Sequence, residues 1–311
     1  MLDISHLNLW HRTKEANRQI LFDVSFSVQR KESLVILGES GSGKTILSRA
    51  ITKLLASPAL QVEGTIMYEG TSLLTLHEED LMNLRRNRIR YIFQEPNQAL
   101  NPVARIRGQM NLAWDGPNHD DTPLVQVLEN VGISDAREVL DSYPHQLSIG
   151  QAQRVAIAMA LLPKPAILIA DEPTSAVDAA LKFQLMDLIS AIQRQRGLSL
   201  LLVTHDVDIA ERYGTRIVVL YRGRIVESSP VRSFFAAPLH PYSRLLLESR
   251  PRIGKSEMYS VEPVHHGPEE DEATGCAFSV RCPKSQPRCR TEEPQLERVP
   301  GEQEVRCFYW K

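Results

Sequence analysis

The feature that most constrains this chain is Gly38–Thr45, which reads G-E-S-G-S-G-K-T. It follows Ser33–Leu37, a short apolar run typical of a strand buried on both faces. It precedes Ile46–Leu55, where apolar residues recur at helical spacing. Such a glycine-rich turn lets backbone N–H groups surround phosphate groups, and the following helix adds the positive end of its dipole. In this pattern Lys44 reaches the β- and γ-phosphates and the hydroxyl of Thr45 ligates Mg²⁺.

A second chemical signal stands at the end of another apolar run. Ala166–Ala170 is predicted to be a buried strand, and Asp171 and Glu172 follow it directly. An acid at the exposed end of a central strand can meet the Mg²⁺ held by Thr45. The adjacent Glu172 can polarise an attacking water as a general base. An Asp-Glu pair alone is a weak signal, but behind a complete phosphate loop it indicates nucleotide hydrolysis.

The order of the predicted elements indicates an α/β fold. The helix Gln151–Leu162, the strand Ala166–Ala170, the helix Ala179–Arg196 and the strand Leu198–Thr204 alternate, which favours a parallel sheet covered on both faces. The N-terminal part alternates at period two and predicts antiparallel strands. We predict a nucleotide-binding domain at residues 1–250 with an inserted helical subdomain at about 95–160, a linker at 251–272 and a cysteine-rich region at 273–311.

Composition excludes several classes of protein. The 311 residues carry 36 Lys and Arg against 38 Asp and Glu, a net charge of −2, without the basic balance usual in nucleic-acid binding. No apolar run approaches the ~18–20 residues that cross a bilayer. The N-terminus lacks the pattern of a signal peptide. We therefore expect a cytosolic chain whose role at a membrane depends on a partner.

All four cysteines lie near the C-terminus, at Cys276, Cys282, Cys289 and Cys307. Disulfides are disfavoured in a reducing cytosol, so clustered thiols indicate a metal or an iron–sulfur cluster. The spacing C-x5-C-x6-C-x17-C lacks the short C-x2-C knuckles of most zinc modules. Four thiolates in a small irregular segment could enclose an iron–sulfur cube. Zinc and four unligated thiols are the alternatives.

Three further motifs narrow the class of hydrolase: L-S-I-G-Q-A-Q-R at Leu147–Arg154, Gln94 in Y-I-F-Q-E-P, and His205 in L-L-V-T-H-D. With S-A-V-D at Ser175–Asp178 they resemble, in order and spacing, the ATPase subunit of an ABC transporter over about residues 1–250. The resemblance implies an ABC ATPase fold that hydrolyses ATP with Mg²⁺, with Glu172 and His205 catalytic. It implies nucleotide contacts from His11, Gly38, Glu39, Ser40, Gly41, Ser42, Gly43, Lys44, Thr45, Gln94 and Asp171, with Thr45, Gln94 and Asp171 around Mg²⁺.

The same resemblance implies a dimer with composite sites. Ser148, Gly150 and Gln151 would form the signature that closes on ATP held by the opposite subunit, and Asp178 would lie at the dimer seam. The family usually has L-S-G-G-Q, whereas Ile149 replaces the first glycine here. A β-branched residue resists positive φ. A positive φ at this position would therefore weaken the partner's site, whereas a negative φ would cost little.

Three stretches resemble the peptide and nickel importer branch (the Opp/Dpp/Nik type): Phe93–Pro102, Ser142–Ser148 and His240–Pro251. The run G-C-A-F-S-V-R-C-P-K-S-Q-P-R-C resembles the C-terminal extension of that branch, which favours a [4Fe–4S] cluster on the four cysteines, with Zn²⁺ second. The branch implies uptake of di- or oligopeptides or a related small solute. It also implies a peripheral position on the cytoplasmic face of the cell membrane.

The implied partners are a second ATPase subunit (usually a paralogue), two transmembrane permease subunits and, indirectly, a solute-binding protein, with no nucleic acid. Sap-type ATPases for cationic peptides or polyamines, and nickel transporters, are alternatives. A soluble ABC ATPase that acts on nucleic acid or ribosomes is a further alternative. An iron–sulfur sensor with a vestigial ATPase is disfavoured by the presence of Lys44, Asp171, Glu172 and His205.

Overall fold

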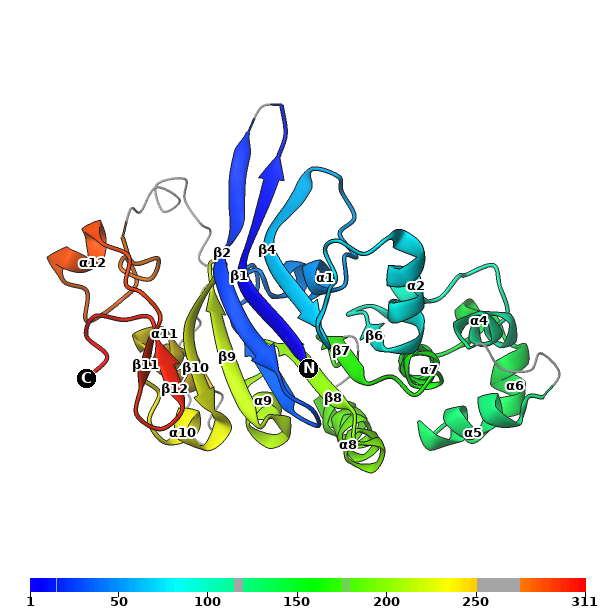
Figure 1. Cartoon of the computed structure of the whole chain (residues 1–311). Helices are drawn as coiled ribbons and strands as arrows, with labels where there is room; N and C mark the ends of the chain where they lie inside the picture. The colour runs from blue at the N-terminus through cyan, green and yellow to red at the C-terminus, as the bar shows by residue number, and fades with distance from the viewer. Residues whose placement is uncertain (15, 115–119, 176, 178, 251–274) are drawn as a thin grey trace.

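The computed structural model describes residues 1–311 except 15, 115–119, 176, 178 and 251–274. The predicted linker at 251–272 and Asp178 therefore lie outside the described residues. The rest forms a four-stranded and an eight-stranded sheet with helices packed around them (Figure 1). None of the described helices has the length and apolar character needed to cross a bilayer.

The four-stranded sheet is antiparallel and has the order β2-β1-β4-β5. Its inward residues alternate at period two on either side of an irregularity: Leu2 and Ile4, and then Leu7 and Leu9, are buried in the first strand, and the pairing register shifts between Ile4 and Leu7. The prediction of an antiparallel N-terminal part is confirmed. Its strands are β1 (Leu2–Arg12), β2 (Asn17–Val28), β4 (Leu60–Tyr68) and β5 (Thr71–Ser72).

The eight-stranded main sheet has the order β11-β12-β10-β9-β3-β8-β7-β6. The strands from β6 to β9 pair in parallel, as predicted, and those beyond β9 pair antiparallel, so the sheet is mixed. Its strands are β3 (Ser33–Leu37), β6 (Ile89–Ile92), β7 (Ile167–Asp171), β8 (Ser199–Thr204), β9 (Arg216–Tyr221), β10 (Arg224–Pro230), β11 (Glu297–Val299) and β12 (Gln303–Val305).

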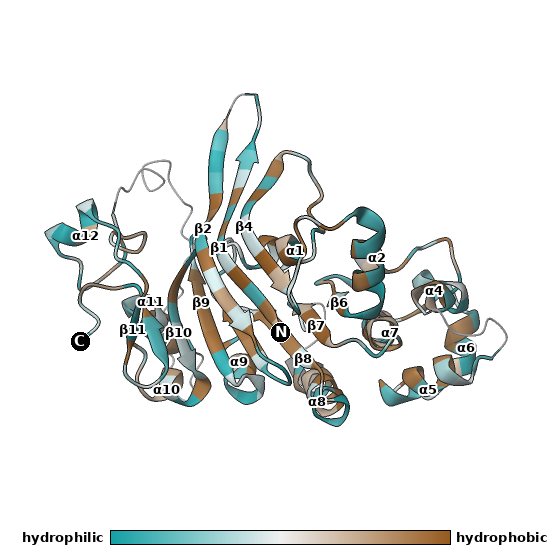
Figure 2. Cartoon of the chain, viewed as in Figure 1, coloured by the Kyte–Doolittle hydropathy of each residue, from teal (hydrophilic) through white to brown (hydrophobic). Residues whose placement is uncertain are grey.

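Two hydrophobic cores lie on the two faces of the main sheet. Leu34 and Ile36 of β3 pack with the N-terminal sheet and with α1 (Lys44–Ile51), whereas Val35 and Leu37 pack with helices on the opposite face. The central strands are accordingly hydrophobic along their length (Figure 2). Helices that contribute to the second core include α8 (Ala179–Arg196), α9 (Val207–Tyr213), α10 (Val231–Ala236) and α11 (Pro241–Glu248).

A run of helices separates β6 from β7 in the chain and forms one end of the molecule (Figure 1). Its range is close to that of the predicted helical subdomain. The helix α4 was not predicted individually from the sequence, although its Ile106 and Met110 are fully buried. The elements are α3 (Pro96–Ala99), α4 (Ile106–Ala113), α5 (Thr122–Asn130), α6 (Ala136–Asp141), a 3₁₀ turn (Pro144–Gln146) and α7 (Ile149–Leu161), with α2 (Glu78–Asn87) before β6.

The described part of the cysteine-rich region, residues 275–311 (the cysteine segment), is joined to the main sheet. Its strand β12 pairs with β10, so the sheet continues across the predicted domain boundary. Phe278 and Val305 of the segment are fully buried, and Phe278 belongs to the same core as the helices. The segment also holds the short helix α12 (Pro287–Thr291).

Leu201→Ala tests the core between the two sheets. Leu201 is fully buried in β8, so the truncation is expected to lower the free energy of unfolding by about 2–5 kcal/mol. Urea denaturation of the purified variant measures this loss. The matched control is Leu112→Ala in α4, where the side chain is 77% exposed and a change within about 0.5 kcal/mol is expected. Equal losses in both variants would contradict the placement of this core.

Candidate nucleotide-binding site

The phosphate loop, Gly38–Thr45, joins β3 to α1 as the sequence predicts. Glycine is required at two of its positions. A Cβ on Gly38 would lie 2.3 Å from the carbonyl oxygen of Leu220. Gly43 is the N-cap of α1 and has a φ of 101°, which L side chains rarely adopt.

Buried polar atoms of the loop suit a phosphate. Lys44 is buried, and its Nζ donates to the carbonyl oxygens of Gly38 and Glu39, at 2.8 Å each. Burial lowers the pKa of Lys44, and the charges of Glu172 and Asp171 oppose that shift. The hydroxyl of Ser42 is buried with no hydrogen-bond partner among the described residues. A triphosphate would supply an anion to the lysine and an acceptor to this hydroxyl.

Asp171 ends β7 beside the loop and is completely buried. The Thr45 hydroxyl donates to one of its carboxylate oxygens at 3.0 Å, and the Tyr91 hydroxyl donates to the other at 2.8 Å. Burial raises the pKa of Asp171, and these two hydrogen bonds oppose the shift. The threonine and the aspartate predicted to hold Mg²⁺ are therefore adjacent.

Tyr91 was not predicted as a site residue. It lies in β6, and only the pairing of β6 with β7 places its hydroxyl on Asp171. Burial raises the pKa of Tyr91, so its hydroxyl stays a proton donor at neutral pH. The only sequence signal is an aromatic residue at the start of the motif Y-I-F-Q-E-P, which carries no information about strand order.

Glu172 and His205, the predicted catalytic residues, contact each other. The Nδ1–H of His205 lies 2.9 Å from both carboxylate oxygens of Glu172, and Lys44 Nζ lies 3.9 Å from one of them. This hydrogen bond is the main reason that the pKa of His205 is raised. Glu172 has a φ of 47°, a left-handed conformation that costs about 1–3 kcal/mol for a non-glycine residue. Such strain is typical of functional sites.

Lys44, Thr45, Glu172 and His205 line one pocket of about 590 Å³, a size that suits a small-molecule ligand, whereas Asp171 and Ser42 are not among its lining residues. Gln94, which follows β6, lines it together with the loop, Glu172 and His205. The lining includes Ile20 of β2, whereas the predicted adenine contact, His11, is not among the lining residues. His11 lies in β1 opposite Arg18.

The signature residues begin α7, away from this pocket. Ser148 is the N-cap: its hydroxyl accepts from the N–H of Gln151, whose side chain accepts from the N–H of Ser148. Ile149 is the first residue of α7, and its φ is negative. Isoleucine in place of the glycine usual in the family therefore causes no backbone strain. Its side chain is 65% exposed. Ser148, Gly150 and Gln151 do not line the chain's own nucleotide pocket.

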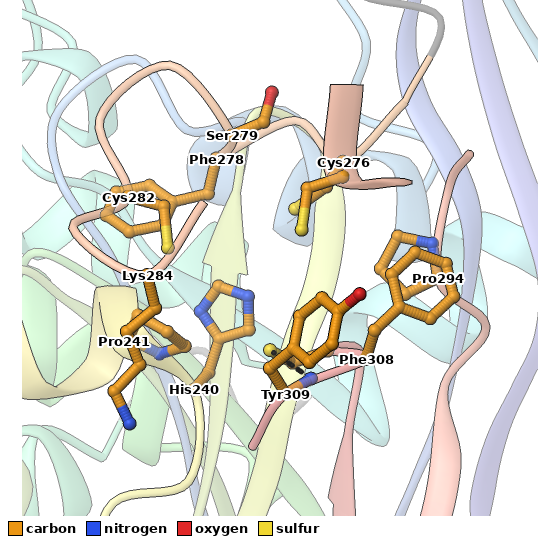
Figure 3. Close-up of a pocket in the computed structure, with 12 residues that line it drawn as sticks. His240, Pro241, Cys276, Phe278, Ser279, Cys282, Lys284, Pro294, Phe308 and Tyr309 are labelled. Carbon is orange, nitrogen blue, oxygen red and sulfur yellow. Dashed lines mark hydrogen bonds between the residues drawn. The ribbon is translucent and has the colours of Figure 1, made fainter. Parts of the chain in front are cut away.

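The four cysteines line a separate pocket with His240, Phe278, Phe308 and Tyr309. Figure 3 shows the sulfur atoms of Cys276 and Cys282 directed toward the space around the ring of His240. Burial raises the pKa of the Cys276 thiol to about 11 and also raises the pKa of Cys282 and Cys307. Within the part of the chain that the structure describes, no three His, Cys, Asp or Glu side chains lie close enough to hold one metal ion.

The contact between His205 and Glu172 predicts a pH dependence of stability. Because the folded pKa of His205 is raised, its protonation stabilises the fold fully below the ordinary pKa of about 6.5 and less as pH rises through the raised value. We expect His205→Gln to lower Tm more at pH 5.5 than at pH 9, by a modest amount because the side chain is 63% exposed. His145→Gln, at an exposed histidine, is the control. A Tm difference independent of pH would contradict this assignment.

The chain matches the family model for ABC transporters over residues 21–175 and that for the oligopeptide/dipeptide transporter C-terminal region over residues 226–289. It is 38% identical to the dipeptide transport ATP-binding protein DppD of Haemophilus influenzae, over 99% of this chain and 94% of that protein. It is 34% identical to the oligopeptide transport ATP-binding protein AppD of Bacillus subtilis, over 100% of this chain and 97% of that protein.

Solved structures of ABC transporter cassettes are also similar to this chain. The dimeric structure of MJ0796, a bacterial ABC transporter cassette, is 28% identical, with a TM-score of 0.67 over 75% of this chain and 99% of that one. A post-hydrolysis dimer of the same cassette bound to ADP and Pi is 27% identical, with a TM-score of 0.66 over 75% of this chain and 99% of that chain. This chain is an ABC-type ATPase and belongs to the ATP-binding proteins of ABC transporters, in the oligopeptide and dipeptide branch.

Proposed function

We propose that this chain binds and hydrolyses ATP to drive the import of dipeptides or oligopeptides through a membrane permease. The observation that carries the ATPase part is the convergence of Lys44, Thr45, Glu172 and His205 on one pocket, with the Asp171 carboxylate hydrogen-bonded to Thr45 behind it. The similarity to DppD and AppD, which extends over nearly the whole chain, supports the peptide substrate.

Each residue of the site has a role in this proposal. The phosphate loop and Lys44 hold the triphosphate, and Thr45 and Asp171 hold Mg²⁺ with Gln94 at the edge of the pocket. Glu172 takes the proton of the attacking water, because its carboxylate faces the same pocket as Lys44. His205 orients Glu172 through their hydrogen bond and is exposed enough to reach the γ-phosphate. His11 stays a prediction for the adenine contact.

Hydrolysis requires a second ATPase subunit in this proposal. The first turn of α7 can donate backbone N–H groups to an anion. Ser148, Gly150 and Gln151 would donate to the partner's ATP, and the N–H groups of Ser148 and Gln151 would exchange their contacts within the helix cap for the phosphate. The exposed Ile149 side chain would then face the partner, and Asp178 would lie at the seam. Two permease subunits would bind the helical end of the chain, which places it on the cytoplasmic face of the membrane.

Glu172→Gln tests the ATPase and its coupling to transport. The amide keeps the shape of the side chain but cannot accept a proton, so kcat is expected to fall by about 10²–10⁴-fold. ATP binding should persist, and an ATP-bound dimer should accumulate during gel filtration. Cells that carry only this variant should not take up a labelled dipeptide.

Two matched variants control this experiment. Glu79→Gln, at an exposed position in α2, should hydrolyse ATP as the wild type does. Lys44→Ala should lose ATP binding itself. Rapid hydrolysis by Glu172→Gln would exclude this residue as the base. If cells that carry only Glu172→Gln lose nickel or polyamine uptake but still take up peptides, the peptide assignment is excluded.

We also propose that the four cysteines hold a polynuclear iron–sulfur cluster, not a single zinc ion. The four cysteines form no disulfide and line one pocket, and their spacing lacks the short C-x2-C knuckles of most zinc modules. Phe278, Phe308 and Tyr309 surround them and would limit access of water. Burial disfavours the thiolates of Cys276 and Cys282, and a cationic iron core would compensate for this. The cluster would cross-link the segment.

Anaerobic purification tests the cluster. The expected product is brown, contains about four iron and four sulfide per chain, and loses its visible absorption when Cys282→Ser is introduced. Chelation or oxidation should lower the Tm of the wild type, because the cross-link of the segment is lost. Ser279→Ala, in the same loop, is the control and should keep the iron. One zinc per chain without sulfide would refute the proposal.

A further inference from the structure

The cysteine segment contacts the phosphate loop directly. Arg281, in the loop between Cys276 and Cys282, donates from Nη1 and Nη2 to the two carboxylate oxygens of Glu39, at 2.8 and 3.0 Å. The pair is bidentate, which is the strong geometry for arginine and a carboxylate. The side chains of Arg281 and Glu39 are only 15% and 31% exposed, so solvent screens the pair less than an ordinary surface ion pair.

A second contact holds the same residue of the loop. The backbone N–H of Glu39 donates to the hydroxyl of Tyr242 at 2.9 Å. Tyr242 belongs to α11 and is fully buried, with its ring 4.5 Å from that of Tyr221 and 5.5 Å from that of Phe278. Phe278 lies in the same loop as Arg281. Both the backbone and the side chain of Glu39 are therefore fixed by residues at or near the cysteine segment.

The charge of Glu39 matters because of its position. It is the second residue of the phosphate loop, it lines the nucleotide pocket, and its carbonyl accepts from Lys44. A carboxylate there repels a triphosphate unless a cation compensates for it. The guanidinium of Arg281 stays charged throughout the accessible pH range, so it supplies that compensation at all times.

We propose that Arg281 is a positioning residue for the phosphate loop, through which the cysteine segment sets the affinity of the chain for ATP. This inference rests on the proposed ATP site. Arg281 acts by neutralising Glu39 and by holding the acceptor of Lys44 in place. By linkage, ATP binding must in turn favour the packed state of the cysteine segment by the same factor.

Two measurements test the proposal, both with the cysteine site loaded: steady-state kinetics of the full chain together with its second ATPase subunit, and ATP binding to the full chain. Arg281→Gln leaves Glu39 unpaired, and KM and Kd for ATP are expected to rise about tenfold, as loss of a charge-assisted pair predicts. The kcat at saturating ATP should stay within about twofold, because the reacting groups are not touched. Added salt should reduce the defect, since it screens Glu39 from the phosphates.

The matched variants separate charge from structure. Arg298→Gln, on an exposed ion pair with Glu304 in the same segment, should leave KM unchanged. Glu39→Gln should lower KM, because it removes the negative charge and keeps Arg281. The double variant Glu39→Gln/Arg281→Gln should return KM toward the wild-type value. KM is thus expected to rise in Arg281→Gln and to fall in Glu39→Gln. A residue that only anchors the segment would not produce these opposite changes.

The outcomes are distinguishable. If Arg281→Gln lowers Tm but leaves KM and Kd unchanged, or if both single variants raise KM equally, Arg281 only anchors the segment and the proposal is wrong. If Arg281→Gln does not fold, the direction in which Glu39→Gln changes KM tests the proposal: a lower KM supports it and a higher KM contradicts it. If the wild-type chain itself fails to bind ATP while Lys44→Ala behaves identically, the proposed function fails instead.

Discussion

The structure depends on the compensation of ionisable groups buried at one edge of the main sheet. Lys44, Asp171 and Glu172 are 6%, 0% and 7% exposed, and a buried charge without partners is strongly destabilising. Because β3, β7 and β8 run parallel, the residues that follow them meet at the same edge. The partners of each group therefore come from neighbouring strand ends, and the same contacts hold together the residues to which we assign the chemistry.

Local signals were sufficient for the part of the site that is contiguous in the chain. The strand Ser33–Leu37, the glycine-rich loop and the helix after it were predictable, because alternation and glycine positions are local properties. Tyr91 and Arg281 were not predictable, because their contacts depend on strand order and on residues far apart in sequence. The pairing of β12 with β10 was not predictable either, because a strand of three residues carries too little pattern.

The continuation of the main sheet explains why the cysteine segment packs so close to the nucleotide site. Glu227 of β10 is fully buried, and its carboxylate accepts the N–H groups of Leu239 and His240 while its backbone pairs with Val305. Burial lowers the pKa of His240 to about 3, so its neutral ring accepts the N–H of Tyr242. This buried polar network fixes the start of α11, which carries the hydroxyl bonded to Glu39.

The nucleotide pocket thus has contacts with both ends of the molecule. On one side, the Ser175 hydroxyl donates to the carbonyls of Glu172 and Gln94, at 3.0 and 3.4 Å, which joins the residue after β7 to the start of the helical region. On the other side, Arg281 joins the loop to the cysteine segment. A ligand that changes the geometry of this pocket must change the free energy of both contacts, and each contact must change ligand affinity by the same amount. Occupancy of the pocket and the packing of each end of the molecule are therefore linked through these contacts.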